Sequence, residues 1–160
     1  MRRNRGFSLI ELLIVVAIIL IIAAIAVPSY LNSKMAANEA SAVAGVRTLN
    51  SAQISYSSSY PTVGFASTLS VLTGNCTGAT IPTSSAACLI DQALASGTKS
   101  GYTFTISNVS GTPASTYEVF ASPTLVNSSG IHYFCSFADA VVRTSPSAIS
   151  TCDATVSPQQ

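Results

Sequence analysis

Apolar residues follow one another almost without a break from Phe7 to Pro28. Every residue from Leu12 to Val27 is apolar, and a single carboxylate, Glu11, stands near the start of the run. A helix of this length that is apolar on every side is typical of a membrane span. A lone ionised carboxylate in hydrocarbon costs several kcal/mol, roughly, and needs a partner. The pattern predicts a membrane helix in which Glu11 is either neutral near the lipid interface or neutralised by a group outside the segment.

Beyond Pro28 the apolar positions narrow to one stripe at helical spacing. The stripe consists of Leu31, Met35, Ala42, Val46, Leu49 and Tyr56, and Asn38 and Gln53 interrupt it. Proline in a lipid-facing or packed helix kinks it or opens it locally rather than ending it, so we expect Pro28 to mark a kink. The pattern predicts one helix from near Phe7 to about Ser57, with residues 7–28 as the transmembrane part and residues 29–58 as an amphipathic continuation.

The second half of the chain reads as a loop followed by short strands. Residues 59–100 are rich in Ser, Thr and Gly and predict a connecting loop, with a short helix at about 84–95. Alternating apolar and polar residues, separated by turns at 108–115 and 123–130, predict four strands at 101–107, 116–122, 131–137 and 138–144. The expected fold class is α+β, in which a long N-terminal helix packs against a small antiparallel sheet formed by residues 101–160.

The distribution of charge predicts the orientation of the chain in the membrane. Of the 160 residues 8% are charged and 48% are hydrophobic, whereas soluble domains average about a quarter charged. Arg2, Arg3 and Arg5 precede the apolar run, so the positive-inside rule places residues 1–6 in the cytoplasm and the bulk of the chain across the membrane. Without those six residues four basic side chains would face six acidic ones, for a net charge of −2. Neither balance suggests nucleic-acid binding.

The sequence GFSLIE at residues 6–11 resembles the processing and assembly motif of type IV prepilins and pseudopilins, and the similarity continues to Tyr30. The resemblance implies that a membrane-embedded peptidase cuts between Gly6 and Phe7 and methylates the new amino terminus of Phe7. Residues 1–6 would then be a leader peptide. Glu11 would pair with the Phe7 amine of a neighbouring subunit inside the bilayer, where water does not screen the attraction. An intramolecular contact between Glu11 and the amine is the alternative.

The same resemblance implies partners and a location. The expected function is that of a structural subunit of a type IV pilus, a helical homopolymer that serves adhesion, twitching motility or DNA uptake. Its partners would be other copies of the chain, the prepilin peptidase and an inner-membrane assembly platform. Before assembly the chain would cross the inner membrane once with its N-terminus in the cytoplasm, and afterwards it would lie in an extracellular pilus. A pseudopilin of a type II secretion system and a minor pilin or adhesin are the alternatives.

Four cysteines lie beyond the apolar run, and their even number favours disulfides in an oxidising compartment. The tight Cys-x-x-Cys spacing of a zinc site is absent, so we expect no metal. Three pairings are possible, and we expect the nearest-neighbour pairs Cys76–Cys88 and Cys135–Cys152. Each closes a short loop, which the chain-entropy description values at about 3 kcal/mol. The second pair resembles the C-terminal disulfide loop of many pilins.

The chain lacks the residue patterns of an enzyme. His132 is the sole histidine, and in a strand it is most simply a surface or sheet-packing residue. No G-x-S-x-G, H-E-x-x-H or phosphate-binding P-loop spacing occurs. Asp91, Asp139 and Asp153 are too scattered for a calcium loop. We therefore expect neither catalysis nor a cofactor, and a membrane-anchored exported enzyme is disfavoured.

Overall fold

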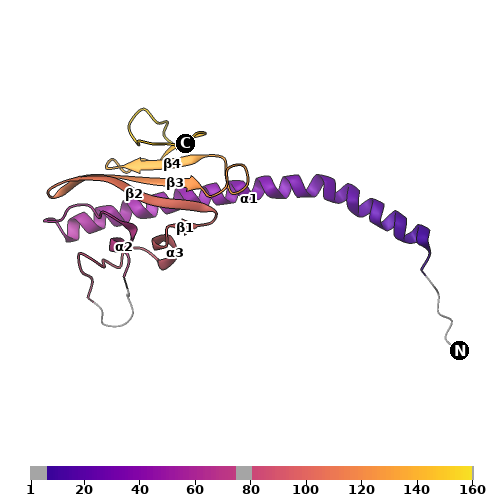
Figure 1. Ribbon diagram of the computed structural model, residues 1–160, viewed down its shortest axis with the longest axis horizontal. Helices are drawn as coiled ribbons and strands as arrows, with labels where there is room; N and C mark the ends of the chain where they lie inside the picture. Colours follow the sequence, from indigo (N-terminus) through magenta and orange to yellow (C-terminus); the bar gives the residue numbers. More distant parts are fainter. Residues whose placement is uncertain (1–6, 75–80, 160) are drawn as a thin grey trace. The chain divides into compact units, whose positions relative to one another are not determined.

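The computed structural model describes residues 7–74 and 81–159. The chain divides into two compact units, residues 1–34 and 35–160, and each is described by itself. The helices are α1 (Leu9–Ser59), α2 (Leu69–Leu72) and α3 (Gln92–Ala95). The strands are β1 (Thr98–Lys99), β2 (Tyr102–Gly111), β3 (Ala114–Pro123), β4 (Tyr133–Phe137) and β5 (Arg143–Ser145). The expected α+β fold, with a long apolar N-terminal helix and a small antiparallel sheet, is confirmed (Figure 1).

The first unit contains the beginning of α1. The helix begins at Leu9, two residues after the expected start, and continues through Pro28. All the large apolar side chains from Phe7 to Leu31 are between 46% and 81% exposed. Leu31 was expected to lie on the buried stripe, but half of its surface is exposed, because the packed part of the helix begins further along.

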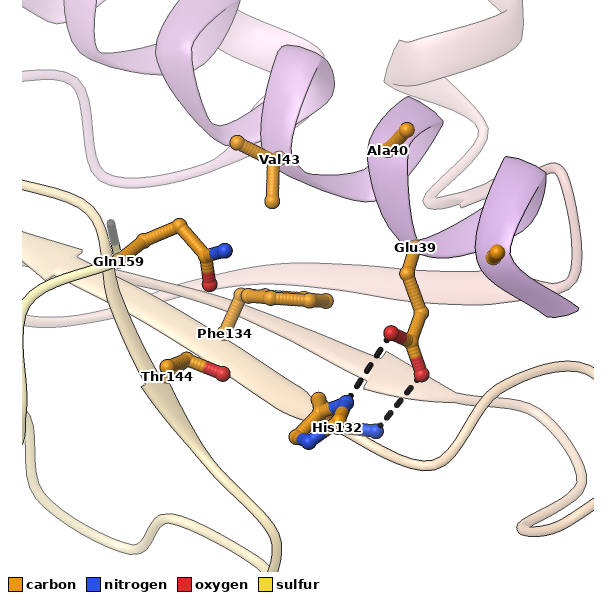
Figure 2. Close-up of a pocket in the computed structure, with 8 residues that line it drawn as sticks. Glu39, Ala40, Val43, His132, Phe134, Thr144 and Gln159 are labelled. Carbon is orange, nitrogen blue, oxygen red and sulfur yellow. Dashed lines mark hydrogen bonds and ion pairs between the residues drawn. The ribbon is translucent and has the colours of Figure 1, made fainter.

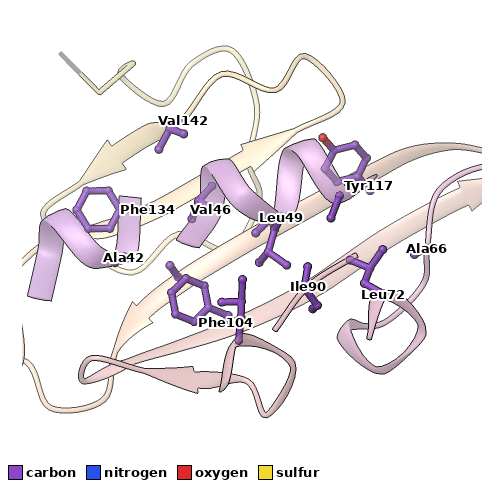
Figure 3. Packing of buried hydrophobic residues seen from close by; sticks show 14 of the residues in the cluster. Ala42, Val46, Leu49, Ala66, Leu72, Ile90, Phe104, Tyr117, Phe134 and Val142 are labelled. Carbon is purple, nitrogen blue, oxygen red and sulfur yellow. The ribbon is translucent and has the colours of Figure 1, made fainter. Parts of the chain in front are cut away.

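In the second unit the remainder of α1 packs against a five-stranded antiparallel sheet with the strand order β1-β2-β3-β4-β5. Its buried side chains there are Ala42, Val46, Leu49, Asn50, Ala52, Gln53 and Tyr56, together with Gly45. They recur at three- and four-residue spacing, which places them on one face of the helix. Leu49 and Val46 meet Phe104 from β2 and Tyr117 from β3 in a single core (Figure 3). The predicted stripe is therefore confirmed from Ala42 to Tyr56.

Gly45 allows this close packing. A Cβ atom at residue 45 would lie 2.7 Å from the Cε1 and Cζ atoms of Phe104, a distance shorter than real Cβ contacts show. Glycine lowers helix stability by about 1 kcal/mol relative to alanine. At this position the cost is offset, because the missing side chain lets the ring of Phe104 reach the helix backbone.

Two expectations about the strands were wrong in detail. The predicted strand at 138–144 is mostly a turn, and β5 occupies only Arg143–Ser145. The reason is that the Asp139 side chain accepts hydrogen bonds from the Val141 N–H and from Arg143, which folds this segment back on itself. The predicted turn at 108–115 is shorter, because β2 runs to Gly111 and β3 begins at Ala114, with a register shift near Asn108.

The segment expected to be a connecting loop with one short helix contains α2, α3 and β1. The helix expected at about 84–95 is reduced to Gln92–Ala95. The backbone N–H groups of Ala87, Leu89 and Ile90 donate to the carbonyls of Val71 and Leu72, so these residues are held by α2 rather than by a helix of their own. Asp91 then caps α3 by accepting a 2.7 Å hydrogen bond from the Leu94 N–H.

Candidate functional site

The N-terminal end of α1 carries the expected assembly residues. The Ser8 N–H donates to Glu11 Oε2 at 2.9 Å, which is one arm of a capping box, since Ser8 directly precedes the helix and Glu11 lies three residues later. The Ser-x-x-Glu spacing signals such a cap, and our reading of the sequence missed it. Between Phe7 and Leu31, Glu11 is the sole charged side chain. The cap leaves its second carboxylate oxygen available to another donor.

Around and beyond Glu11 the helix presents apolar side chains in every direction. Among the described residues, α1 is the single helix that is long and apolar enough to cross a membrane, judged by length and composition. Burying an apolar side chain is worth roughly 1.5–3 kcal/mol, so leaving this surface in water would be strongly unfavourable. The surface therefore requires lipid or other apolar helices around it.

Two of the expected site residues cannot be compared with the structure, and a third can. Gly6 and Cys76 lie outside the described residues, and with them the leader, the cleavage position and the Cys76–Cys88 pair. Pro28 lies inside α1 and does not end the helix.

The second unit, residues 35–160, is called the head below. In it, two buried side-chain amides of α1 fasten the helix to the sheet and its loops. Asn50 Nδ2 donates to Ser136 Oγ at 2.8 Å and to the Ala140 carbonyl at 3.1 Å, and its Oδ1 accepts from the Tyr117 hydroxyl at 3.3 Å. Burial raises the pKa of Tyr117 to about 12, so this hydroxyl remains a donor. These bonds join α1, β3, β4 and the turn that follows β4.

Gln53 performs the same task one turn later. Its Nε2 donates to the Ala66 carbonyl at 2.9 Å and its Oε1 accepts from the Ala66 N–H at 2.8 Å. The side chain pairs with the loop backbone as a neighbouring strand would. Gln53 was expected to interrupt the apolar stripe, but it is fully buried and fully bonded, because the polar loop backbone beside it needs a partner inside the core.

The loop between β3 and β4 is attached to α1 by Asn38 and Glu39. Asn38 Nδ2 donates to the Ser129 carbonyl at 2.8 Å, and Glu39 Oε1 accepts from the N–H groups of Ile131 and His132 at 2.7 and 3.1 Å. His132 Nδ1 lies 3.0 Å from Glu39 Oε2 (Figure 2). Burial works to raise the pKa of Glu39, but the hydrogen bonds from these two N–H groups outweigh it and the pKa is lowered.

Beside this contact lies a cavity of about 340 Å³ with an apolar wall formed by Val43 and Phe134 (Figure 2). The interpretation of His132 as a surface or sheet-packing residue missed its partner, because Glu39 is 93 residues away in the sequence. The pair fastens the loop between β3 and β4 to α1. No group of three or more His, Cys, Asp or Glu side chains that could hold a metal occurs within residues 7–74 and 81–159.

The C-terminal loop, residues 146–159, is held by a disulfide and a side-chain hydrogen bond, and the turn before β5 is held by an ion pair. Cys135 and Cys152 are linked, in agreement with the expected pair, and both are buried. Glu118 Oε2 accepts a hydrogen bond from the Cys152 N–H at 2.9 Å. The guanidinium of Arg143 donates to both carboxylate oxygens of Asp139, at 2.6 and 3.1 Å. Burial works to raise the pKa of Asp139, but the bonds from Arg143 outweigh it and lower the pKa.

Comparisons with known proteins agree with the character of the N-terminal segment. Residues 1–27 match the family described as the prokaryotic N-terminal methylation motif. Over 54 residues the chain is 48% identical to the type IV major pilin protein PilA of Myxococcus xanthus (strain DK1622). The match covers 34% of this chain and spans about a quarter, 24%, of that relative. No solved structure matches the chain significantly. The methylation motif and the similarity to a major pilin, found in a chain with a helix-and-sheet fold, make this chain similar to type IV pilins.

Proposed function

We propose that this chain is the structural subunit of a type IV pilus filament and that it polymerises through its N-terminal helix. The observation that carries the proposal is the exposed apolar beginning of α1, most of which lies within residues 1–27, the part that matches the methylation motif. If this part of α1 packed in a bundle with the same part of other copies, its apolar surface would be buried against protein instead of lipid or water. The role is structural, and we assign no catalytic step to the chain.

Processing would prepare the helix for assembly. We propose that prepilin peptidase removes residues 1–6 by cutting between Gly6 and Phe7, and that the new amino terminus of Phe7 is methylated. The new ammonium would lie close to Glu11 along the chain, and the capping contact from Ser8 holds that carboxylate at the same end of the helix. Glu11 of an incoming subunit would pair with the Phe7 amine of a neighbour and set the axial position of each copy.

The proposed route begins in the inner membrane, with residues 7–28 spanning it once and the N-terminus in the cytoplasm. An assembly platform in that membrane would then extract the processed chain into an extracellular filament. Pro28 would give the helix a kink that helps packing in the bundle. Adhesion, twitching motility and DNA uptake are the roles that such a filament serves.

The test of this function is the intact mass and N-terminal sequence of the protein sheared from the cell surface. We expect a chain that begins at methylated Phe7 in the sheared fibre fraction. The same processed chain confined to the membrane would contradict a pilus and favour a secretion pseudopilin or a minor subunit. A chain that begins at Met1 would contradict the processing step itself.

A second test addresses Glu11. With the chain as sole subunit, Glu11→Ala should leave the protein in the membrane but abolish fibres, because the carboxylate that pairs with the neighbouring amine is gone. The matched control is Asp153→Ala, which removes an exposed carboxylate outside the apolar run, and we expect fibres to persist in that variant. Normal fibres from Glu11→Ala would refute the pairing.

A further inference from the structure

The charged side chains of the described residues separate into paired and unpaired groups. Three carboxylates have a basic partner, in the contacts Asp91–Lys99 at 3.2 Å, Glu39–His132 at 3.0 Å and Asp139–Arg143 at 2.6 Å. The charged side chains without an oppositely charged partner among residues 7–74 and 81–159 are Glu11, Lys34, Arg47, Glu118 and Asp153. Of these five, Arg47 and Glu118 are the cation and the anion whose charge no neighbouring group in the fold balances.

The other three have an evident environment. Glu11 belongs to the capped start of α1, and Lys34 is an exposed residue at the end of the first unit. Asp153 is fully exposed and accepts hydrogen bonds from the N–H and hydroxyl of Thr155. Water and local donors are enough for these side chains.

Arg47 lies on the exposed face of α1. Its neighbours Val46 and Leu49 are buried against the sheet, so the Arg47 side chain leaves the helix on the side that faces away from the sheet. The residues three and four positions away, which could form an ion pair along the helix, are Val43, Ala44, Asn50 and Ser51. None of them is acidic, so the guanidinium has no partner on its own helix.

Glu118 lies on the opposite side of the same unit. It alternates along β3 with Tyr117 and Val119, which are buried under α1, so its side chain is on the outer face of the sheet. There it borders a cavity of about 310 Å³, which forms where β2 and β3 extend past the end of β4 at Phe137. Oε2 of Glu118 is bonded to the Cys152 N–H, while Oε1 has no protein partner within the described chain.

The lining of this cavity suits a cationic donor. Besides Glu118 it contains the Asn108 amide and the hydroxyls of Ser110 and Thr116, which are bonded to each other and can still accept a hydrogen bond. No basic side chain lines the cavity, and the nearby guanidinium of Arg143, which lies over the Phe137 ring, is already paired with Asp139. Asn108 has a positive φ of 51° at the register shift between β2 and β3. A shift of this kind redirects a side chain, here at the rim of the cavity. A guanidinium carries five donors and a weakly hydrated charge, which makes it a better occupant than an ammonium.

We propose that Arg47 of one copy enters this cavity of a second copy and pairs with Glu118. This inference rests on the proposed filament function. Because the two residues lie on opposite faces of the head, the contact joins unlike surfaces of two copies. Repeated contacts of this heterologous type produce rings or open helical assemblies, whereas a self-complementary contact would stop at a dimer.

The experiment is a charge exchange in the full chain expressed as sole subunit, with sheared filament protein measured against membrane-held protein. We expect Arg47→Glu and Glu118→Arg each to lower filament yield about tenfold, since a like-charge contact replaces an attractive one. The double variant should restore most of the yield, because the pair is present with its signs reversed. Glu118→Gln, whose amide oxygen can still accept from Cys152, should give an intermediate loss.

Two controls keep the outcomes distinct. Lys34→Glu reverses the other unpaired cation of α1, and we expect near-normal filaments from it. Recovery of the Cys135–Cys152 linkage from each variant, by peptide mapping without reduction, checks that the head has folded. A filament yield from Arg47→Glu equal to that of the wild-type chain would overturn the contact. Losses in the two single variants that the double variant does not repair would overturn it as well. Absence of filaments from the wild-type chain would instead refute the filament function.

Discussion

The two halves of α1 share one helix and have opposite surroundings. From residue 9 to 34 every large apolar side chain is exposed, whereas from residue 42 to 56 the apolar positions on one face are buried under the sheet. The first half has apolar residues on all sides and the second half on one. The difference shows which half of the helix has its apolar surface covered by the same chain. The head covers its helix face, while the first half depends on lipid or on other copies.

Polar residues follow the same division. Asn50 and Gln53 lie in the core of the second half, and each has hydrogen-bond partners for both its donor and its acceptor atoms. Between Phe7 and Leu31 the one charged side chain, Glu11, is placed at the helix end, where the Ser8 N–H donates to it. Buried polar groups are tolerated when they are hydrogen-bonded, and such bonds fix one arrangement of the head. The first half of α1 has only apolar contacts to offer, which do not select one arrangement.

The largest expected effect comes from truncating one leucine in each half. Leu49→Ala should destabilise the head by about 2–5 kcal/mol, because it leaves a cavity in the core. Leu31→Ala, on the exposed half, should change the stability by less than about 0.5 kcal/mol. Thermal unfolding of the full chain in detergent micelles, followed by near-ultraviolet circular dichroism, measures both. Equal shifts in the two variants would contradict the division of α1 into a packed and an unpacked half.

A somewhat smaller effect is expected from removing the disulfide of the head. Replacing both Cys135 and Cys152 by alanine opens a link across 17 residues, worth about 3 kcal/mol, mainly through the greater freedom of the unfolded chain. Glu118 and the backbone hydrogen bonds from Thr144 to Ser157 and from Gln159 to Val142 still hold the C-terminal loop, so we expect a folded head with a lower melting temperature. A head that is unfolded at 25 °C in this variant would show that these polar contacts are too weak to hold the loop.

Next comes the close approach of helix and sheet at Gly45. Gly45→Ala should destabilise the head by about 1–3 kcal/mol, because the steric conflict with Phe104 outweighs the gain in helix propensity. Combining it with Phe104→Leu should recover part of that loss relative to Phe104→Leu alone. The exposed neighbour offers a control, since Ala44→Gly should cost only about 1 kcal/mol. Stabilisation by Gly45→Ala would mean that Phe104 can move aside freely.

The smallest effect is a dependence of head stability on acid. Because its pKa is lowered on folding, Asp139 contributes stability that is present above its ordinary pKa. That contribution should be lost as the pH falls from about 5 through the lowered value. Asp139→Asn should therefore flatten the fall in melting temperature between pH 5 and pH 3. Identical pH profiles for the wild-type chain and this variant would show that other carboxylates control the acid response.

The candidate site was predictable in its local parts. GFSLIE at residues 6–11, the uninterrupted run up to Val27 and the stripe from Ala42 to Tyr56 are patterns of neighbouring residues. They led to the helix and to the proposal that Glu11 acts in assembly. The Ser8 cap was also readable from its spacing. The contact between Glu39 and His132 was not readable, because it depends on two segments that come together only when the sheet docks on the helix.

By itself, the sequence determined the α+β fold, the long helix and its apolar first half, since hydrophobic periodicity and helix geometry are local. The tertiary structure decided where polar side chains of α1 are buried, because Gln53 and Asn50 bond to loop and turn groups far along the chain. It also decided that residues 138–142 turn back at Asp139, whose side chain accepts hydrogen bonds from Val141 and Arg143. Those outcomes depend on which distant groups compete for each donor, acceptor and charge, and a linear pattern does not contain that competition.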